Sequence, residues 1–114
     1  MEARELRLGN YVLLQENDIV KIDFIDGIYF ELGFNNMANV KALNQFDPIP
    51  LTEEWLLKFG LDEYRKNIGI WNNGDAVYFN YGNTNHEKSV AIKHVHQLQN
   101  LYFALTNEEL TINL

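Results

Sequence analysis

The segment at residues 48–61 has the sequence Pro-Ile-Pro-Leu-Thr-Glu-Glu-Trp-Leu-Leu-Lys-Phe-Gly-Leu. It constrains the fold more than any other stretch of this 114-residue chain. Pro48 and Pro50 fix the backbone φ angle and offer no N–H, so the residues around them are extended and lie outside the centre of any sheet. Thr52 is a favourable helix N-cap, and Gly60 suits the left-handed position just past a helix C-terminus. These signals predict a short helix between Thr52 and Gly60.

The predicted helix, from about residue 53 to residue 59, is too short to be stable alone in water, so burial has to hold it in place. Its apolar side chains cover most of its circumference, which favours a position against a sheet with a second surface over its back. The expected anchors are Trp55, Leu56, Leu57 and Phe59. We therefore interpret Trp55 as a core anchor; the alternative is a platform on which a base or sugar stacks.

Charge and composition exclude several classes of protein. The net charge of −7 and the pI near 4.8 argue against binding to a nucleic-acid backbone, because proteins of that class carry clustered lysine and arginine. The absence of cysteine excludes disulfides, thiolate metal sites and cysteine nucleophiles. No apolar run reaches membrane-spanning length, and the first residues lead into no apolar signal-peptide core. We therefore expect one folded domain that binds neither nucleic acid nor a membrane.

Short runs of alternating apolar and polar residues dominate the first part of the chain, about residues 1–50. In the run at 19–25, Val20, Ile22 and Phe24 share one face, as in a half-buried strand. The strands predicted in this way span residues 6–14, 19–25, 28–32 and 40–43. A tight-turn Asp-Gly dipeptide joins the second and third of them. Short antiparallel strands with tight turns indicate a small, strongly bent sheet, like that of an SH3-type barrel.

The second part, about residues 51–114, combines the first helix with a hairpin, a further strand and a second helix. Asn73-Gly74 is the strongest hairpin signal in the chain, since both residues accept a positive φ. The second helix is predicted at 95–105, where apolar residues recur at helical spacing, and Asn107 suits the left-handed residue that ends it. The strands predicted here span residues 68–71, 76–81, 88–93 and 110–114. The sequence thus predicts a single α+β domain over residues 1–114.

Three motifs together resemble a known group of sequences. They are Glu-Leu-Arg-Leu-Gly-Asn-Tyr-Val near the N-terminus, Pro-Ile-Pro-Leu-Thr-Glu-Glu-Trp-Leu-Leu-Lys-Phe-Gly in the middle, and Val-His-Gln-Leu-Gln-Asn-Leu-Tyr-Phe-Ala-Leu-Thr-Asn-Glu-Glu-Leu near the C-terminus. Across most of its length the chain resembles a family of short uncharacterised proteins from phages, prophages and mobile elements of gut Bacteroidales. The resemblance implies a cytoplasmic protein of a bacterium or its phage, and it implies no activity. Accessory phage proteins of this size often bind or inhibit host machinery.

Two histidines give the one enzyme-like pattern in the sequence. His94 and His96 would share a face on a strand, and His86 with Glu87 would then complete a metal site. The alternative is that both histidines are polar residues at the start of the second helix. Ser89 has no glycine elbow around it, and the paired carboxylates are adjacent in sequence rather than opposed across a cleft. We therefore expect no catalytic residue and no cofactor.

Aromatic side chains supply the candidate binding site. Tyr29 and Tyr78 fall opposite the apolar faces of their predicted strands, and with Tyr11 and Trp71 they are expected to be partly exposed. Patches of tyrosine and tryptophan build interfaces and stacking sites. The alternative is a sheet covered on both faces, or exposed tyrosines without a binding role. The asparagine-rich loops expected near such a site contain Asn35, Asn36, Asn72, Asn73, Asn83 and Asn85.

The sequence leaves three hypotheses open. The first is a non-catalytic interaction domain that binds another protein, or a second copy of itself, through exposed aromatics and an acidic face. The second is a protein that sequesters a nucleotide or another small molecule by stacking its base on tyrosine or tryptophan. The third is a metal-dependent hydrolase built on His94 and His96.

Overall fold

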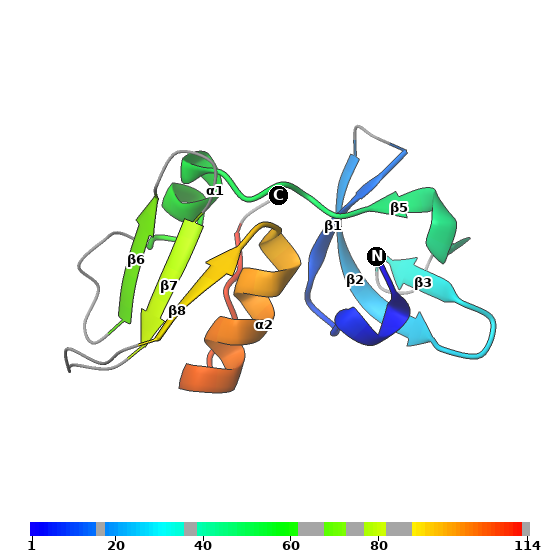
Figure 1. Ribbon diagram of the computed structural model, residues 1–114. Coiled ribbons are helices and arrows are strands. Elements are labelled where there is room, and N and C mark those ends of the chain that lie inside the picture. Colours follow the sequence, from blue (N-terminus) through cyan, green and yellow to red (C-terminus); the bar gives the residue numbers. More distant parts are fainter. Residues whose placement is uncertain (16–17, 36–38, 62–67, 73–76, 82–87, 113–114) are drawn as a thin grey trace. The chain divides into compact units, whose positions relative to one another are not determined.

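The computed structural model describes residues 1–15, 18–35, 39–61, 68–72, 77–81 and 88–112, and for residues 68–72, 77–81 and 88–90 it describes the backbone alone (Figure 1). The chain forms two compact units. Unit 1 consists of Met1–Ile49 and His94–Leu114, and unit 2 consists of Pro50–Lys93. The two parts expected from the sequence span about residues 1–50 and 51–114. The second part was expected to run through residue 114, whereas the residues from His94 onward belong to unit 1.

Unit 1 contains a five-stranded antiparallel sheet in the order β4-β3-β2-β1-β5. Its strands are β1 (Tyr11–Leu14), β2 (Asp18–Asp26), β3 (Glu31–Phe34), β4 (Asn39–Ala42) and β5 (Phe46–Asp47). The first half of β2 pairs with β1 and its second half pairs with β3, with an irregularity between Ile22 and Phe24. Such a bulge bends a strand, so the sheet curls, and β5 returns to the other side of β1.

Two short 3₁₀ helices accompany the strands: η1 (Ala3–Glu5) precedes β1, and η2 (Leu43–Gln45) leads from β4 into β5. A meander of four strands, then a 3₁₀ turn, then a fifth strand that pairs with the first is the arrangement of a small SH3-like barrel. The predicted fold class, α+β with a small bent antiparallel sheet and two helices, is confirmed.

The curled sheet encloses an apolar core. Its buried members are Leu6, Val12, Leu14, Ile22, Leu32, Phe34 and Phe46. Phe34 and Phe46 meet edge to face, with ring centroids 6.0 Å apart, which is a favoured arrangement for aromatic pairs. β4 contributes no buried side chain, because all four of its residues are exposed.

The connection between β2 and β3 departs from the strand predicted at residues 28–32. Asp26 Oδ1 accepts hydrogen bonds from the N–H groups of Ile28 (2.8 Å) and Tyr29 (3.1 Å), so a side chain organises a turn here. Phe30 follows with a φ of +54°. The strand therefore begins only at Glu31, and three apolar residues of the predicted strand lie in the turn.

Unit 1 also contains α2 (Val95–Thr106), one residue longer than the predicted helix, which packs against β1. The N–H of His94 donates to Gln97 Oε1 at 3.0 Å, as expected of a residue that caps the helix. Asn107 ends the helix with a φ of +61°, and this prediction is confirmed. The buried apolar face of α2 consists of Val95, Leu98 and Tyr102.

The strand predicted at residues 110–114 is wrong for residues 110–112, which form an irregular segment after α2. Residues 113 and 114 lie outside the described residues. Side chains provide the backbone partners that a neighbouring strand would have provided. The N–H of Ile112 donates to the Tyr11 hydroxyl at 2.9 Å, and the carbonyl of Leu110 accepts from Gln99 Nε2 at 3.1 Å.

Unit 2 begins with the predicted helix, α1 (Glu53–Lys58). Thr52 Oγ1 accepts a hydrogen bond from the N–H of Trp55 at 3.4 Å, which confirms the N-cap. Gly60 has a φ of +74°, which confirms the left-handed position past the helix. Trp55 is buried as an anchor, but Leu57 is 68% exposed, so its predicted burial is wrong.

The remaining strands of unit 2 form an antiparallel sheet in the order β6-β7-β8. They are β6 (Ile68–Asn72), β7 (Val77–Tyr81) and β8 (Lys88–Ile92). The two strands of the predicted hairpin therefore pair, while its Asn73-Gly74 turn lies outside the described residues. Among the described helices of the chain, none has the length and apolar character needed to cross a membrane.

Candidate functional site

The turn between β2 and β3 presents three consecutive apolar side chains to solvent. Ile28, Tyr29 and Phe30 are 80%, 73% and 58% exposed. Single apolar residues at a surface are ordinary, but adjacent ones form a patch of the kind found at interaction sites. Phe30 also adopts a φ of +54°, which bulky residues rarely occupy. A strained backbone at an exposed aromatic residue lowers the stability of the fold, and the half-exposed ring buries little surface in return. The conformation of Phe30 therefore indicates a role in binding rather than in stability.

An apolar hollow of about 450 Å³ adjoins this turn within unit 1. Its apolar wall consists of Met1, Ile25, Phe30 and Leu43. A second hollow of about 500 Å³ has a mixed polar and apolar lining; it shares Met1, Phe30 and Leu43 with the first and adds Tyr29, Ala42, Asn44, Phe46 and Asp47. The two hollows are therefore neighbours around Phe30, and together we name them the apolar hollow.

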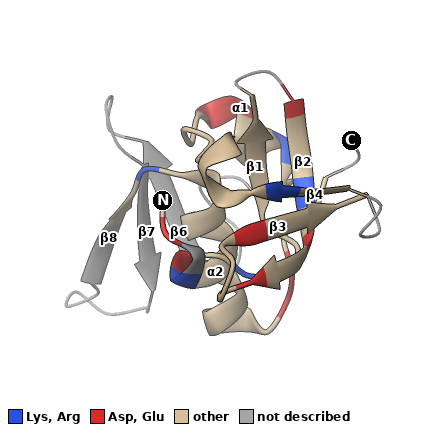
Figure 2. Cartoon of the chain, turned by 90° about the vertical axis from the view of Figure 1, so that its right-hand side faces the viewer, with Lys and Arg blue, Asp and Glu red and all other residues tan. Residues whose placement is uncertain are grey.

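The charged side chains that line the apolar hollow are those of Glu2, Arg4 and Asp47, and Asp26 and Glu31 are next to lining residues in the sequence. Arg4 and Glu2 form a salt bridge with an N–O distance of 2.6 Å, so their charges offset each other. The carboxylates at or beside the lining that form no ion pair within the described residues are those of Asp26, Glu31 and Asp47. Lys41 on β4 carries a nearby positive charge. Figure 2 shows an acidic residue on β3 and a basic residue on β4. This excess of carboxylates favours a ligand with positive charge.

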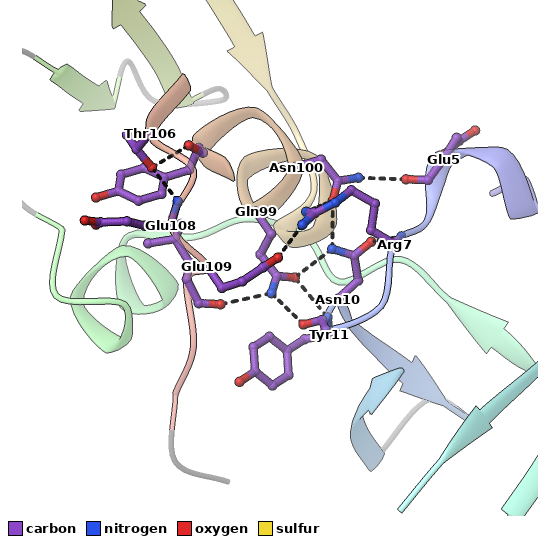
Figure 3. Close-up of polar contacts among 12 residues, drawn as sticks. Glu5, Arg7, Asn10, Tyr11, Gln99, Asn100, Thr106, Glu108 and Glu109 are labelled. Carbon is purple, nitrogen blue, oxygen red and sulfur yellow. Dashed lines mark hydrogen bonds and ion pairs between the residues drawn. The ribbon is translucent and has the colours of Figure 1, made fainter. Parts of the chain in front are cut away.

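A buried polar network forms a second constellation in unit 1, between α2 and the start of β1 (Figure 3). Gln99 is its centre and is fully buried. Its Oε1 accepts from the N–H of Tyr11 at 2.9 Å. Its Nε2 donates to the carbonyls of Gly9 at 2.9 Å and Leu110 at 3.1 Å. One side chain of α2 thus joins the backbone at residues 9–11 to the backbone of Leu110, two segments that are far apart in the sequence.

Asn100 extends this network toward η1. Its Nδ2 donates to the carbonyl of Glu5 at 2.8 Å, and its Oδ1 accepts from Asn10 Nδ2 at 2.9 Å and from the Arg7 guanidinium at 3.0 Å. The Arg7 guanidinium also pairs with Glu109. Because these polar groups satisfy one another, the network is structural: it fixes α2 and the following segment to the start of β1.

His96 lies on α2 with only 1% of its surface exposed. Neither ring nitrogen has a hydrogen-bond partner among the described residues, although Glu5 Oε2 lies 3.4 Å from Nε2. The ring of His94 stacks on it, with centroids 5.7 Å apart. Burial lowers the pKa of His96 below its ordinary value of 6.5 and outweighs the nearby Glu5 carboxylate, which raises it. His96 is therefore neutral at neutral pH.

The buried imidazole of His96 is expected to make the fold sensitive to mild acid. Because its pKa is lowered in the folded state, the unfolded chain binds a proton at higher pH than the folded chain does. Neutral His96 therefore stabilises the folded chain fully at pH values above the unfolded pKa near 6.5. This stabilisation is lost as the pH falls below that value. Urea unfolding of the wild type and of His96→Phe, compared between about pH 7.5 and about pH 5.5, measures this, since groups present in both proteins contribute alike to the comparison. An equal pH dependence in both proteins would contradict the prediction.

The four aromatic residues predicted as a site have different environments. Tyr29 is 73% exposed, as predicted. Tyr11 is 1% exposed, so the prediction of its exposure is wrong; its backbone binds Gln99 and its hydroxyl binds the Ile112 backbone. Trp71 and Tyr78 are Cα partners on β6 and β7 of unit 2, where the structure describes the backbone alone.

The remaining predicted site residues are the asparagines of the expected loops and the residues of the possible metal site. Asn35 is exposed with a φ of +56°, and Asn72 is the last residue of β6. Asn36, Asn73, Asn83 and Asn85, together with His86 and Glu87, lie outside the described residues. His94 and His96 are adjacent, but within the described part of the chain no three histidine, aspartate or glutamate side chains gather as a metal site would require.

Apart from Tyr29, the residues that build the apolar hollow were missed by sequence reasoning. Phe30 was assigned to the inward face of a strand, and Leu43 to the end of another. The available signal was Asp26 before Gly27, since an aspartate side chain that binds the backbone two and three residues later ends a strand and starts a turn.

Comparison with known proteins adds no relative: no protein-family model, no curated protein and no solved structure matches this chain.

Proposed function

We propose that this chain is a non-catalytic protein-binding domain, an accessory protein of a Bacteroidales phage or mobile element that acts in the cytoplasm. Its docking surface is the turn at residues 28–30 together with the apolar hollow. The observation that carries this proposal is Phe30, an aromatic residue that is 58% exposed although its backbone is strained and its neighbours in the turn are also apolar.

The chemistry of the surface defines the class of partner. Tyr29 and Phe30 are aromatic anchors of the kind that dominate binding energy in protein interfaces. The carboxylates of Asp26, Glu31 and Asp47 attract a protein surface that carries lysine or arginine around an apolar centre. The same carboxylates repel phosphate groups, which disfavours the nucleotide-sequestering alternative at this surface.

Replacement of Phe30 by glycine is expected to abolish binding while leaving the fold intact. Glycine accepts a φ of +54° without strain, and this gain offsets the lost contacts of a half-exposed ring. The free energy of unfolding should therefore change by less than about 1 kcal/mol. Affinity for a protein partner should fall at least about tenfold, as for a central interface residue.

The measurement is affinity capture from a Bacteroidales lysate, followed by titration of the captured protein against each variant. Tyr29→Ala should behave like Phe30→Gly. Leu57→Ala is the matched control, because Leu57 is 68% exposed and apolar but lies on α1 of unit 2. Unchanged affinity in Phe30→Gly, or a nucleotide in place of a protein in the eluate, would overturn the proposal.

A further inference from the structure

We infer that the partner binds through an extended segment that adds to the sheet along the free edge of β4, with apolar side chains entering the apolar hollow. This inference rests on the proposed function. β4 is the terminal strand of the sheet order, and all four of its residues are exposed. Val40, an apolar β-branched residue, is 43% exposed there. An edge strand with free backbone groups is a template for another strand.

Backbone geometry identifies which groups of β4 have no strand partner within the described part of the chain. The N–H of Leu43 donates to the carbonyl of Phe30 at 2.6 Å, so this pair marks a hydrogen-bonded position between the two strands. Hydrogen-bonded pairs recur every second residue in an antiparallel ladder, which makes Lys41 opposite Leu32 the next such pair. The N–H and C=O groups of Val40 and Ala42 therefore point away from β3 and toward an added strand.

The opposite edge of the sheet is protected, which singles out β4. β5 has only two residues, and Pro48 follows it directly. Short strands and prolines are the devices by which sheet edges avoid pairing with other chains. β4 is twice as long, with four residues, and contains no proline, so of these devices it carries only a charged side chain, that of Lys41.

Position and charge determine the occupant. Ala42 and Leu43 line the apolar hollow, so a side chain of the added strand next to Ala42 reaches toward it. Glu31 is the partner of Ala42 in the β3–β4 register, and Asp47 lines the same hollow as Ala42. These two carboxylates select a segment with lysine or arginine beside its apolar residues. A second copy is disfavoured, because each copy carries a net charge of −7 and a symmetric pairing centred on Lys41 would place two ammonium groups opposite each other.

A synthetic peptide tests strand addition directly. The probe is acetyl-Lys-Val-Thr-Val-Thr-Val-Lys-amide, and its acidic counterpart carries glutamate in place of both lysines. Amide chemical shifts of the full chain should change at Val40 and Ala42, with affinity at least about tenfold higher for the basic peptide. Shift changes confined to other residues, or equal affinity for the two peptides, would overturn the inference. The basic peptide, when N-methylated at alternate residues, should no longer bind the unmodified protein.

A variant of β4 separates this inference from the proposed function. Val40→Pro removes an N–H that points away from β3, and proline is tolerated at such an edge position. Val40→Thr keeps the N–H and the β-branched shape and is the control. Binding of the basic peptide and of the captured protein should fall at least about tenfold in Val40→Pro and stay unchanged in Val40→Thr. Retained binding in Val40→Pro together with lost binding in Phe30→Gly would overturn strand addition and leave the docking surface standing. A dimer in sedimentation that Val40→Pro dissolves would assign the edge to a second copy and also overturn the inference.

Discussion

Replacing Gln99 by leucine is expected to lower the free energy of unfolding by about 3–5 kcal/mol, the largest effect among the substitutions considered. Leucine has a similar volume but no polar atoms. The N–H of Tyr11 and the carbonyls of Gly9 and Leu110 would then lose the partner that Gln99 provides. Each buried group left unpaired costs about 1–3 kcal/mol, because water cannot replace the lost bond.

Chemical unfolding of Gln99→Leu against the wild type measures this effect. Gln45→Leu is the matched control, since Gln45 is exposed and its side chain binds only the neighbouring Asn44 amide, at 3.3 Å. Its stability should stay within about 0.5 kcal/mol of the wild type. Equal losses in the two variants would show that the amide of Gln99 does not organise unit 1.

Replacing Gly33 by alanine is expected to destabilise the sheet by about 1–3 kcal/mol. Gly33 pairs with Phe24 beside the irregularity in β2. An added Cβ at Gly33 would lie 2.7 Å from the Cβ of Phe24, closer than two such atoms approach. The neighbouring atom is next to the backbone, so the strand itself has to shift and cannot relieve the contact by side-chain rotation.

Gly27→Ala is the control for the Gly33 prediction. An added Cβ at Gly27 meets no atom within 4 Å, so this variant should be neutral or gain up to about 1 kcal/mol from the restricted unfolded chain. Thermal and urea unfolding of both variants give the comparison. A Gly33→Ala protein as stable as Gly27→Ala would contradict the close approach of β2 and β3.

Local signals were the predictable part of this fold. The helix α1, with its cap at Thr52 and its left-handed residue at Gly60, follows from residues that interact within one turn of chain. The left-handed Asn107 is of the same kind. The alternation predicted in β2 describes only its first half, because beyond the irregularity between Ile22 and Phe24 it is Ile25 that packs against the core. Tertiary contacts changed the rest of the prediction: Tyr11 is buried because α2 packs against β1, and the segment at 110–112 binds side chains instead of a strand.

The docking surface was predictable only in part. Tyr29 was placed at the surface because it alternates with apolar neighbours, and this was correct. The position of Phe30 depends on the turn that Asp26 organises and on a positive φ, which residue-type patterns do not encode for phenylalanine. The apolar hollow combines residues from η1 to β5, so no single stretch of sequence contains its signal.

The discontinuity of unit 1 determines when it can complete its fold during synthesis. The N–H of Tyr11 cannot form its hydrogen bond until Gln99, which lies 88 residues later in the chain, has been synthesised. At a translation rate of about 5–20 residues per second, this delay is roughly 4–18 s. Unit 2, by contrast, is one continuous segment, Pro50–Lys93, and can fold before the polar network of unit 1 is complete. During that interval β1 lacks the helix that packs against it, so unit 1 is most exposed to misassembly just before α2 emerges.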